Sequence, residues 1–112
     1  MSEYLFLYRG PSGDSASPEQ MQQIMQKWLA WFKDLGEQGH IKNTGQPLET
    51  AGKVVRGRAK SIHDGPFAEA KDVVNGYTLI EAKDIDQAAK LAGGCPILDR
   101  DGSVEVRPIR KM

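Results

Sequence analysis

A short run near the start of the chain constrains the fold most. Tyr4–Tyr8 is aromatic or apolar at every position, so neither face of a strand built from it is suited to water. Strands that are buried on both faces lie inside a sheet, with neighbours on either side. The run therefore predicts a central β-strand, and the rest of the chain must build a sheet around it and cover both of its faces.

A long amphipathic helix is expected next. Ser17–Gln20 combines an N-cap serine, a proline at the first helical position and a glutamine placed for a capping box. Trp31 is expected in the core, and Gly36 or Gly39 should end the helix. Apolar residues at three- and four-residue spacing predict an inward-facing stripe, made of Met21, Ile24, Met25, Trp28, Phe32 and Leu35.

The middle of the chain predicts a hairpin. After a short strand near Ile41, Lys53–Arg56 and Ala59–Ile62 flank a Gly-Arg pair that suits a two-residue type II′ turn. A single strand over 53–62 is the alternative. His63–Phe67 has the composition of a turn, because Asp, Gly and Pro each favour turn geometry.

The last third of the chain predicts a strand, a helix and a strand. These are Tyr77–Ala82, a helix capped by Asp84 that stops before Gly93, and Val104–Arg107. The resulting order is βαββαβ with an inserted hairpin, an α+β domain of the ferredoxin-like kind over residues 1–112. Both helices would cover one sheet face, so a homodimer packed sheet against sheet is expected to cover the other.

Composition excludes several classes of function. Fifteen basic and fifteen acidic side chains cancel, so no overall charge draws the protein to nucleic acid or to a membrane. The N-terminal apolar run is too short for a signal peptide or a membrane span, which predicts a cytoplasmic protein. Cys95 is the single cysteine, expected as a buried side chain, and with His40 and His63 far apart in sequence no metal or other cofactor is expected.

Three blocks of the sequence resemble a known family. Asp64–Asp72, Asn75–Ala82 and Val104–Ile109 look like the signature blocks of the proteins with an Asp-Gly-Pro-Phe (DGPF) motif within the YCII-related family. The resemblance implies a dimeric α/β barrel related to small-molecule isomerases, monooxygenases and dehydrochlorinases, with a pocket between the sheet and the elements that cap it. It also implies an association with extracytoplasmic-function sigma factors. Some relatives use a His and Asp pair with the His in the first helix, but Glu19–Leu35 contains no His here, so that pair does not carry over.

The candidate site residues cluster around the motif. His63 and Asp64 combine a near-neutral base with a carboxylate and form the candidate catalytic pair. Neighbours in an extended chain point to opposite faces, so the pair meets only if the turn folds them together; the alternative is that Asp64 pins the turn. Glu69, Lys71 and Arg107 are the candidate ligand-binding residues, with a surface pair and a structural ion pair as their alternatives.

The sequence thus predicts a homodimeric small-molecule-binding protein, with a polar or anionic metabolite held near Asp64, Lys71 and Arg107. The residues do not decide whether it is an enzyme. The alternative is a non-enzymatic accessory or regulatory protein associated with sigma-factor control of transcription, in which the motif is architectural.

Overall fold

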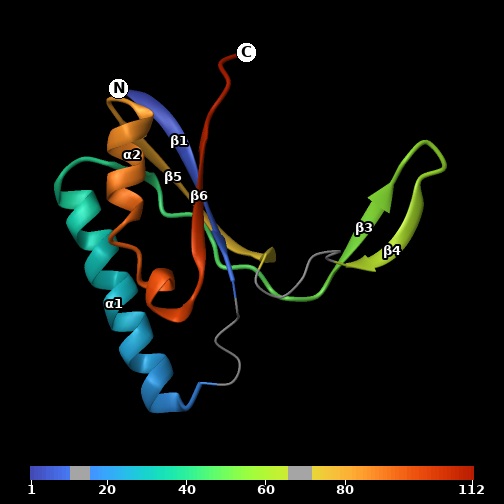
Figure 1. The fold of residues 1–112 in the computed structure, drawn as a ribbon, viewed down its shortest axis with the longest axis horizontal. Helices are drawn as coiled ribbons and strands as arrows, with labels where there is room; N and C mark the ends of the chain where they lie inside the picture. The colour runs from blue at the N-terminus through green and yellow to red at the C-terminus, as the bar shows by residue number, and fades with distance from the viewer. Residues whose placement is uncertain (11–15, 66–71) are drawn as a thin grey trace.

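The fold is α+β, as predicted, and the residues that the structure describes form an antiparallel sheet, two α-helices, a short 3₁₀ helix and a separate hairpin (Figure 1). The computed structural model describes residues 1–10, 16–65 and 72–112. The four-stranded sheet has the order β2-β5-β1-β6, which is the ferredoxin-like order with the hairpin inserted after β2. Its strands are β1 (Ser2–Arg9), β2 (Ile41–Asn43), β5 (Val74–Ala82) and β6 (Ser103–Pro108).

β1 is an inner strand, which confirms the prediction from Tyr4–Tyr8. It pairs with β5 on one side and with β6 on the other, antiparallel in both cases. Tyr4, Phe6 and Tyr8 are buried on the face that carries the helices, whereas Leu5 and Leu7 on the opposite face are half-buried. The described part of the chain therefore fully covers only one of the two apolar faces of the strand.

α1 (Pro18–Glu37) begins where the sequence predicts. The Ser17 hydroxyl accepts a hydrogen bond from the Gln20 backbone N–H, and the Gln20 side chain accepts one from the Ser17 N–H. This capping box satisfies two of the backbone donors that a helix start leaves unpaired. The helix ends before Gly39, whose φ of +79° favours glycine.

The core lies between the helices and the sheet. Trp31 and Leu35 of α1 pack against buried side chains of β1 and β5, and the Phe6 and Trp31 rings stack with centroids 6.1 Å apart. α2 (Ile85–Ala92) carries the predicted Asp84 cap, which accepts from the Gln87 N–H. The short 3₁₀ helix η2 (Pro96–Arg100), which the sequence does not signal, follows α2 and buries Ile97.

The hairpin forms, but its turn differs from the predicted one. β3 (Gly52–Arg56) pairs with β4 (Ser61–Gly65), so the loop contains four residues, 57–60, rather than two. Gly57 and Lys60 both have positive φ, +69° and +56°. The prediction of a turn at His63–Phe67 is wrong for 63–65, which belong to β4, because cross-strand pairing with β3 holds this segment extended; residues 66 and 67 lie outside the described residues.

The hairpin stands away from the sheet (Figure 1). The radius of gyration of 15.4 Å exceeds the value of about 13 Å expected for a compact chain of this length, and the projecting hairpin accounts for the difference. Among the described helices, none is long and apolar enough to cross a membrane.

Candidate functional site

A cavity of about 590 Å³ lies beside the N-terminal two thirds of α1. The helix supplies the apolar wall, formed by Met21, Ile24, Met25, Trp28, Leu29 and Phe32. Met21, Met25 and Leu29 are 37%, 51% and 61% exposed. The prediction that Met21 and Met25 pack into the core is therefore wrong: this part of the stripe faces the cavity, and only Trp31 and Leu35 are buried on α1.

The opposite wall is the segment 44–50, held against β5 by backbone hydrogen bonds. The Leu48 N–H donates to the Asn75 carbonyl over 2.7 Å, and the Tyr77 N–H donates to the Gln46 carbonyl over 3.3 Å. Gly45 permits this approach, because a Cβ at its position would lie 1.8 Å from the Tyr77 carbonyl oxygen. The position of this wall thus depends on a glycine with a φ of +74°.

A one-way chain of hydrogen bonds closes one side of the cavity. The Thr78 hydroxyl lies 2.9 Å from the Thr44 carbonyl oxygen, which can only accept, so Thr78 must donate to it. The oxygen of Thr78 then accepts from the Tyr8 hydroxyl, 2.7 Å away. The Tyr8 hydroxyl donates its one proton to Thr78, so toward a molecule in the cavity the Tyr8 oxygen can act only as a hydrogen-bond acceptor. Burial raises the pKa of Tyr8 far above its ordinary value, so the phenol stays neutral.

Two charged residues line the cavity among those that the structure describes. Glu49 is exposed on the segment 44–50, and Arg100 is half-buried at the end of η2. The two side chains form no ion pair with each other. The described lining residues include no histidine, cysteine or lysine.

The structure does not bring His63 and Asp64 together. They are neighbours on β4 and point to opposite faces of the hairpin. Asp64 forms an ion pair with Lys53 across the hairpin, and His63 Nε2 lies 3.1 Å from the Ser61 hydroxyl. A catalytic role for the pair stays a prediction, while the Lys53 contact agrees with the alternative in which Asp64 pins the local structure.

Gly65 of the same motif also has a packing reason. A Cβ at this position would lie 2.4 Å from Cγ2 of Val54 on the opposite strand. The glycine therefore leaves room for Val54 at the base of the hairpin.

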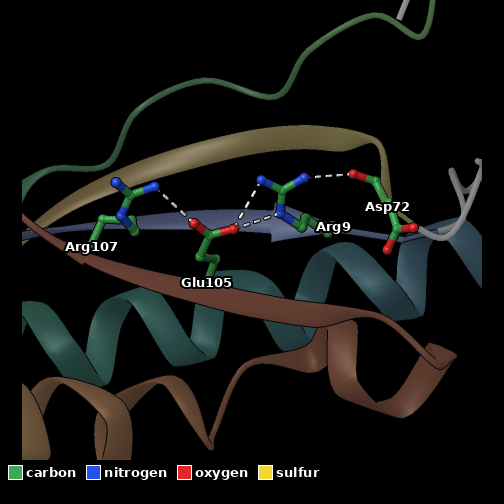
Figure 2. Close-up of polar contacts among 4 residues, drawn as sticks. All are labelled: Arg9, Asp72, Glu105 and Arg107. Carbon is green, nitrogen blue, oxygen red and sulfur yellow. Dashed lines mark hydrogen bonds and ion pairs between the residues drawn. The ribbon is translucent and has the colours of Figure 1, made fainter. Parts of the chain in front are cut away.

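Of the three candidate ligand-binding residues, Glu69 and Lys71 lie outside the described residues. Arg107 lies on the open face of the sheet, away from the cavity, where Figure 2 shows it beside Glu105 and Arg9. Arg107 donates to Oε2 of Glu105 over 3.0 Å, and Arg9 donates to Oε1 over 2.9 Å and to the Asp72 carbonyl over 2.7 Å. This is the structural ion pair given as the alternative for Arg107; a ligand-binding role for it stays a prediction.

The ion pairs change the pKa of the shared carboxyl group. The hydrogen bonds from Arg107 and then Arg9 favour the ionised form and hold the pKa of Glu105 below its ordinary value. At the other end of the same face, Lys42 pairs with Glu3 and Glu81, and the Glu3 contact raises the pKa of Lys42.

Two other predictions concern chemistry elsewhere in the chain. Cys95 is buried, as expected, and its burial raises the pKa of the thiol to about 12, which leaves it a poor nucleophile. Within the described parts of the chain, no cluster of His, Cys, Asp and Glu could hold a metal ion.

Most of the cavity was not predicted from the sequence. Trp28 and Phe32 were expected in the core, but both are only half-buried and line the cavity, and Tyr8, Thr78 and Arg100 were not among the candidate site residues. The available signal was the length of the apolar stripe on α1, which continues through Met21 and Met25 beyond the part of the helix that the core buries.

The chain is similar to known proteins over nearly its whole length. A family model described as the YCII-related domain matches residues 3–112. The fold is similar to that of 5-chloro-2-hydroxyhydroquinone dehydrochlorinase from Burkholderia phenoliruptrix, solved in complex with 2,5-dihydroxybenzoquinone. The TM-score is 0.54 at 16% sequence identity, over 98% of this chain and 95% of the other. No curated protein matches the sequence.

Proposed function

The chain belongs to the YCII-related family, and we propose that it binds a small, flat, largely apolar molecule in the cavity beside α1. The observation that carries the proposal is the cavity itself. Its volume of about 590 Å³ falls within the range of roughly 300–1,000 Å³ that is typical of small-molecule sites. Among its aromatic lining residues, Tyr8, Trp28 and Phe32 offer ring surfaces on which a flat molecule can pack.

The polar part of the wall adds a hydrogen-bonding requirement. Because Tyr8 donates to Thr78, its oxygen accepts a hydrogen bond from the ligand. A hydroxyl or N–H on the edge of a ring meets that requirement. The dehydrochlorinase of similar fold was solved with a small dihydroxyquinone, and such a compound has the flat ring and the hydroxyl groups that this cavity favours.

The proposal concerns binding and names no reaction. Glu49 is the one carboxylate that lines the cavity among the described residues, and the lining offers no imidazole, thiol or amine for general acid-base or nucleophilic chemistry. The rival site for small-molecule binding is the one predicted from the sequence, where a polar or anionic metabolite is held by Asp64, Lys71 and Arg107.

Two further proposals concern the subgroup of the family and the oligomeric state. We assign the chain to the DGPF subgroup because Asp64–Phe67 matches the motif, and the packing of Gly65 on Val54 supports an architectural role for it. We also propose that two copies pair through the open face, because Leu5, Leu7 and Leu79 leave apolar surface there.

A thermal-shift screen against quinones, hydroxylated aromatics and aromatic acids tests the binding site. We expect hits that raise the melting temperature of the wild-type protein, because a ligand that binds only the folded state stabilises it. Met25→Trp should remove the shift, since Met25 is half exposed and its enlargement fills the cavity. Leu98→Trp is the matched control on η2, outside the cavity lining.

Two outcomes would contradict the proposal. A shift that survives in Met25→Trp but is lost in Lys71→Ala would move the site to the rival position. A well-folded protein that gives no hit at all would favour the non-enzymatic accessory role.

A further inference from the structure

Arg100 occupies a distinct position in the fold. It ends η2, is half-buried, and lines both the large cavity and a smaller neighbouring one of about 310 Å³. Ile24 is the other side chain that lines both. Arg100 therefore lies at the junction of an apolar space and a more polar one.

The Arg100 side chain forms no hydrogen bond or ion pair with residues 1–10, 16–65 and 72–112. Other cations near the sheet and α1 do have carboxylate partners there: Arg9 pairs with Glu105, Lys42 pairs with Glu3, and Lys27 lies 3.9 Å from Asp99. A half-buried guanidinium has lost part of its water and still carries five N–H donors. An anionic group in the cavity would supply the charged hydrogen-bond acceptor that the described protein residues do not offer to Arg100.

The charged residues that line the cavity favour an anion at Arg100. Glu49, the other charged lining residue, lies on the opposite wall and is exposed to water. A ligand whose ring packs against Trp28 and Phe32 can therefore place an acidic group at Arg100 and still avoid Glu49. Guanidinium groups bind carboxylates, sulfonates and similar flat anions through paired, charge-assisted hydrogen bonds.

We propose that Arg100 binds the acidic group of the ligand, so that the cavity selects aromatic molecules that carry one negative charge over their neutral analogues. This inference rests on the proposed function, since it names the ligand class of the same cavity. Arg100 acts here as a specificity-determining residue and takes part in no bond-breaking step.

A matched pair of dyes tests the inference. Anilinonaphthalene sulfonate and its uncharged parent, phenyl-naphthylamine, share one aromatic skeleton and differ by the sulfonate. Fluorescence titration should show that the wild-type protein binds the sulfonate more tightly. Arg100→Gln should weaken sulfonate binding by roughly tenfold or more, the effect of losing a charge-assisted hydrogen bond, and should change binding of the neutral dye less than about twofold.

Three variants serve as controls. Arg100→Lys keeps the charge but loses the paired geometry, so it should retain part of the preference for the sulfonate. Arg107→Gln removes a cation on the open sheet face and should leave the binding of both dyes unchanged. Glu49→Gln should leave sulfonate binding equal or slightly tighter, because it removes a like charge from the opposite wall.

The outcomes separate this inference from the proposed function. Equal weakening of both dyes in Arg100→Gln would overturn the role of Arg100 and leave the cavity as a binding site. Equal loss of sulfonate binding in Arg107→Gln would overturn the role of Arg100 and place the anion at the rival site that includes Arg107. If neither dye binds the wild-type protein, or if Met25→Trp binds both as well as the wild type does, the proposed function fails and this inference fails with it.

Discussion

The hydroxyl of Tyr8 on β1 donates a hydrogen bond to Oγ1 of Thr78 on the neighbouring strand β5, over 2.7 Å, and both side chains are buried. The two residues are 70 positions apart in the sequence. Because Thr78 in turn donates to the Thr44 carbonyl, this pair connects the sheet to the segment that forms the outer wall of the cavity.

Thr78→Val should destabilise the protein. Valine keeps the shape of the side chain but leaves the Tyr8 hydroxyl and the Thr44 carbonyl without their partner, so we expect a loss of about 1–3 kcal/mol in the free energy of unfolding. Tyr8→Phe should cost less, because Thr78 can still donate to Thr44. Urea denaturation of both variants measures the two losses of unfolding free energy. A larger loss for Tyr8→Phe would argue against the order in which Tyr8 donates to Thr78 and Thr78 donates to Thr44.

Gly45→Ala should damage the cavity more than Gly39→Ala does. Both glycines have positive φ, +74° and +79°, so each alanine has a backbone cost of roughly 1–2 kcal/mol. Only at Gly45 does the new Cβ clash, 1.8 Å from the Tyr77 carbonyl oxygen, whereas nothing lies within 4 Å at Gly39. Gly45→Ala should therefore unfold at lower urea and also lose dye binding, and equal effects at the two positions would contradict the role of this close approach.

Leu7→Glu should disrupt the proposed homodimer. Leu7 lies on the open face of β1 beside Glu105 of β6, and a second carboxylate without a partner, buried between two copies next to Glu105, is costly. Light scattering should give about twice the chain mass of 12.4 kDa for the wild type and for Leu98→Glu, whose substitution is on η2. Leu7→Glu should give the mass of one chain, and a wild-type protein of one chain mass at micromolar concentration would rule out the dimer.

Glu105 should contribute a pH-dependent part of the stability. Its pKa is lower in the folded protein, because of Arg107 and then Arg9, so its ionised form stabilises the fold at pH values above the unfolded pKa of about 4.3. That contribution is lost as the pH falls through the folded pKa. The difference in melting temperature between the wild type and Glu105→Gln should therefore be largest near neutral pH and shrink in acid, and a difference independent of pH would contradict the ion pair.

The sequence alone determined the features that depend on neighbouring residues. The capping box of Ser17 and Gln20 fixed the start of α1, the Asp84 cap fixed the start of α2, and the apolar run Tyr4–Tyr8 identified the inner strand. Each of these depends on hydrogen bonds or on a run of apolar side chains within a few residues. The order of elements then reduced the possible topologies to a few, and the observed sheet is one of them.

What each side chain faces depends on contacts that the local sequence does not show. Met21 and Met25 belong to a regular apolar stripe, but the helix extends past the core, so they line a cavity instead. His63 and Asp64 are extended and separated because β3 pairs with them, and periodicity within β4 cannot show that partner. Tyr8, Thr78 and Arg100 meet the cavity through packing between segments far apart in the sequence, and contacts of that kind depend on the whole fold rather than on any local pattern.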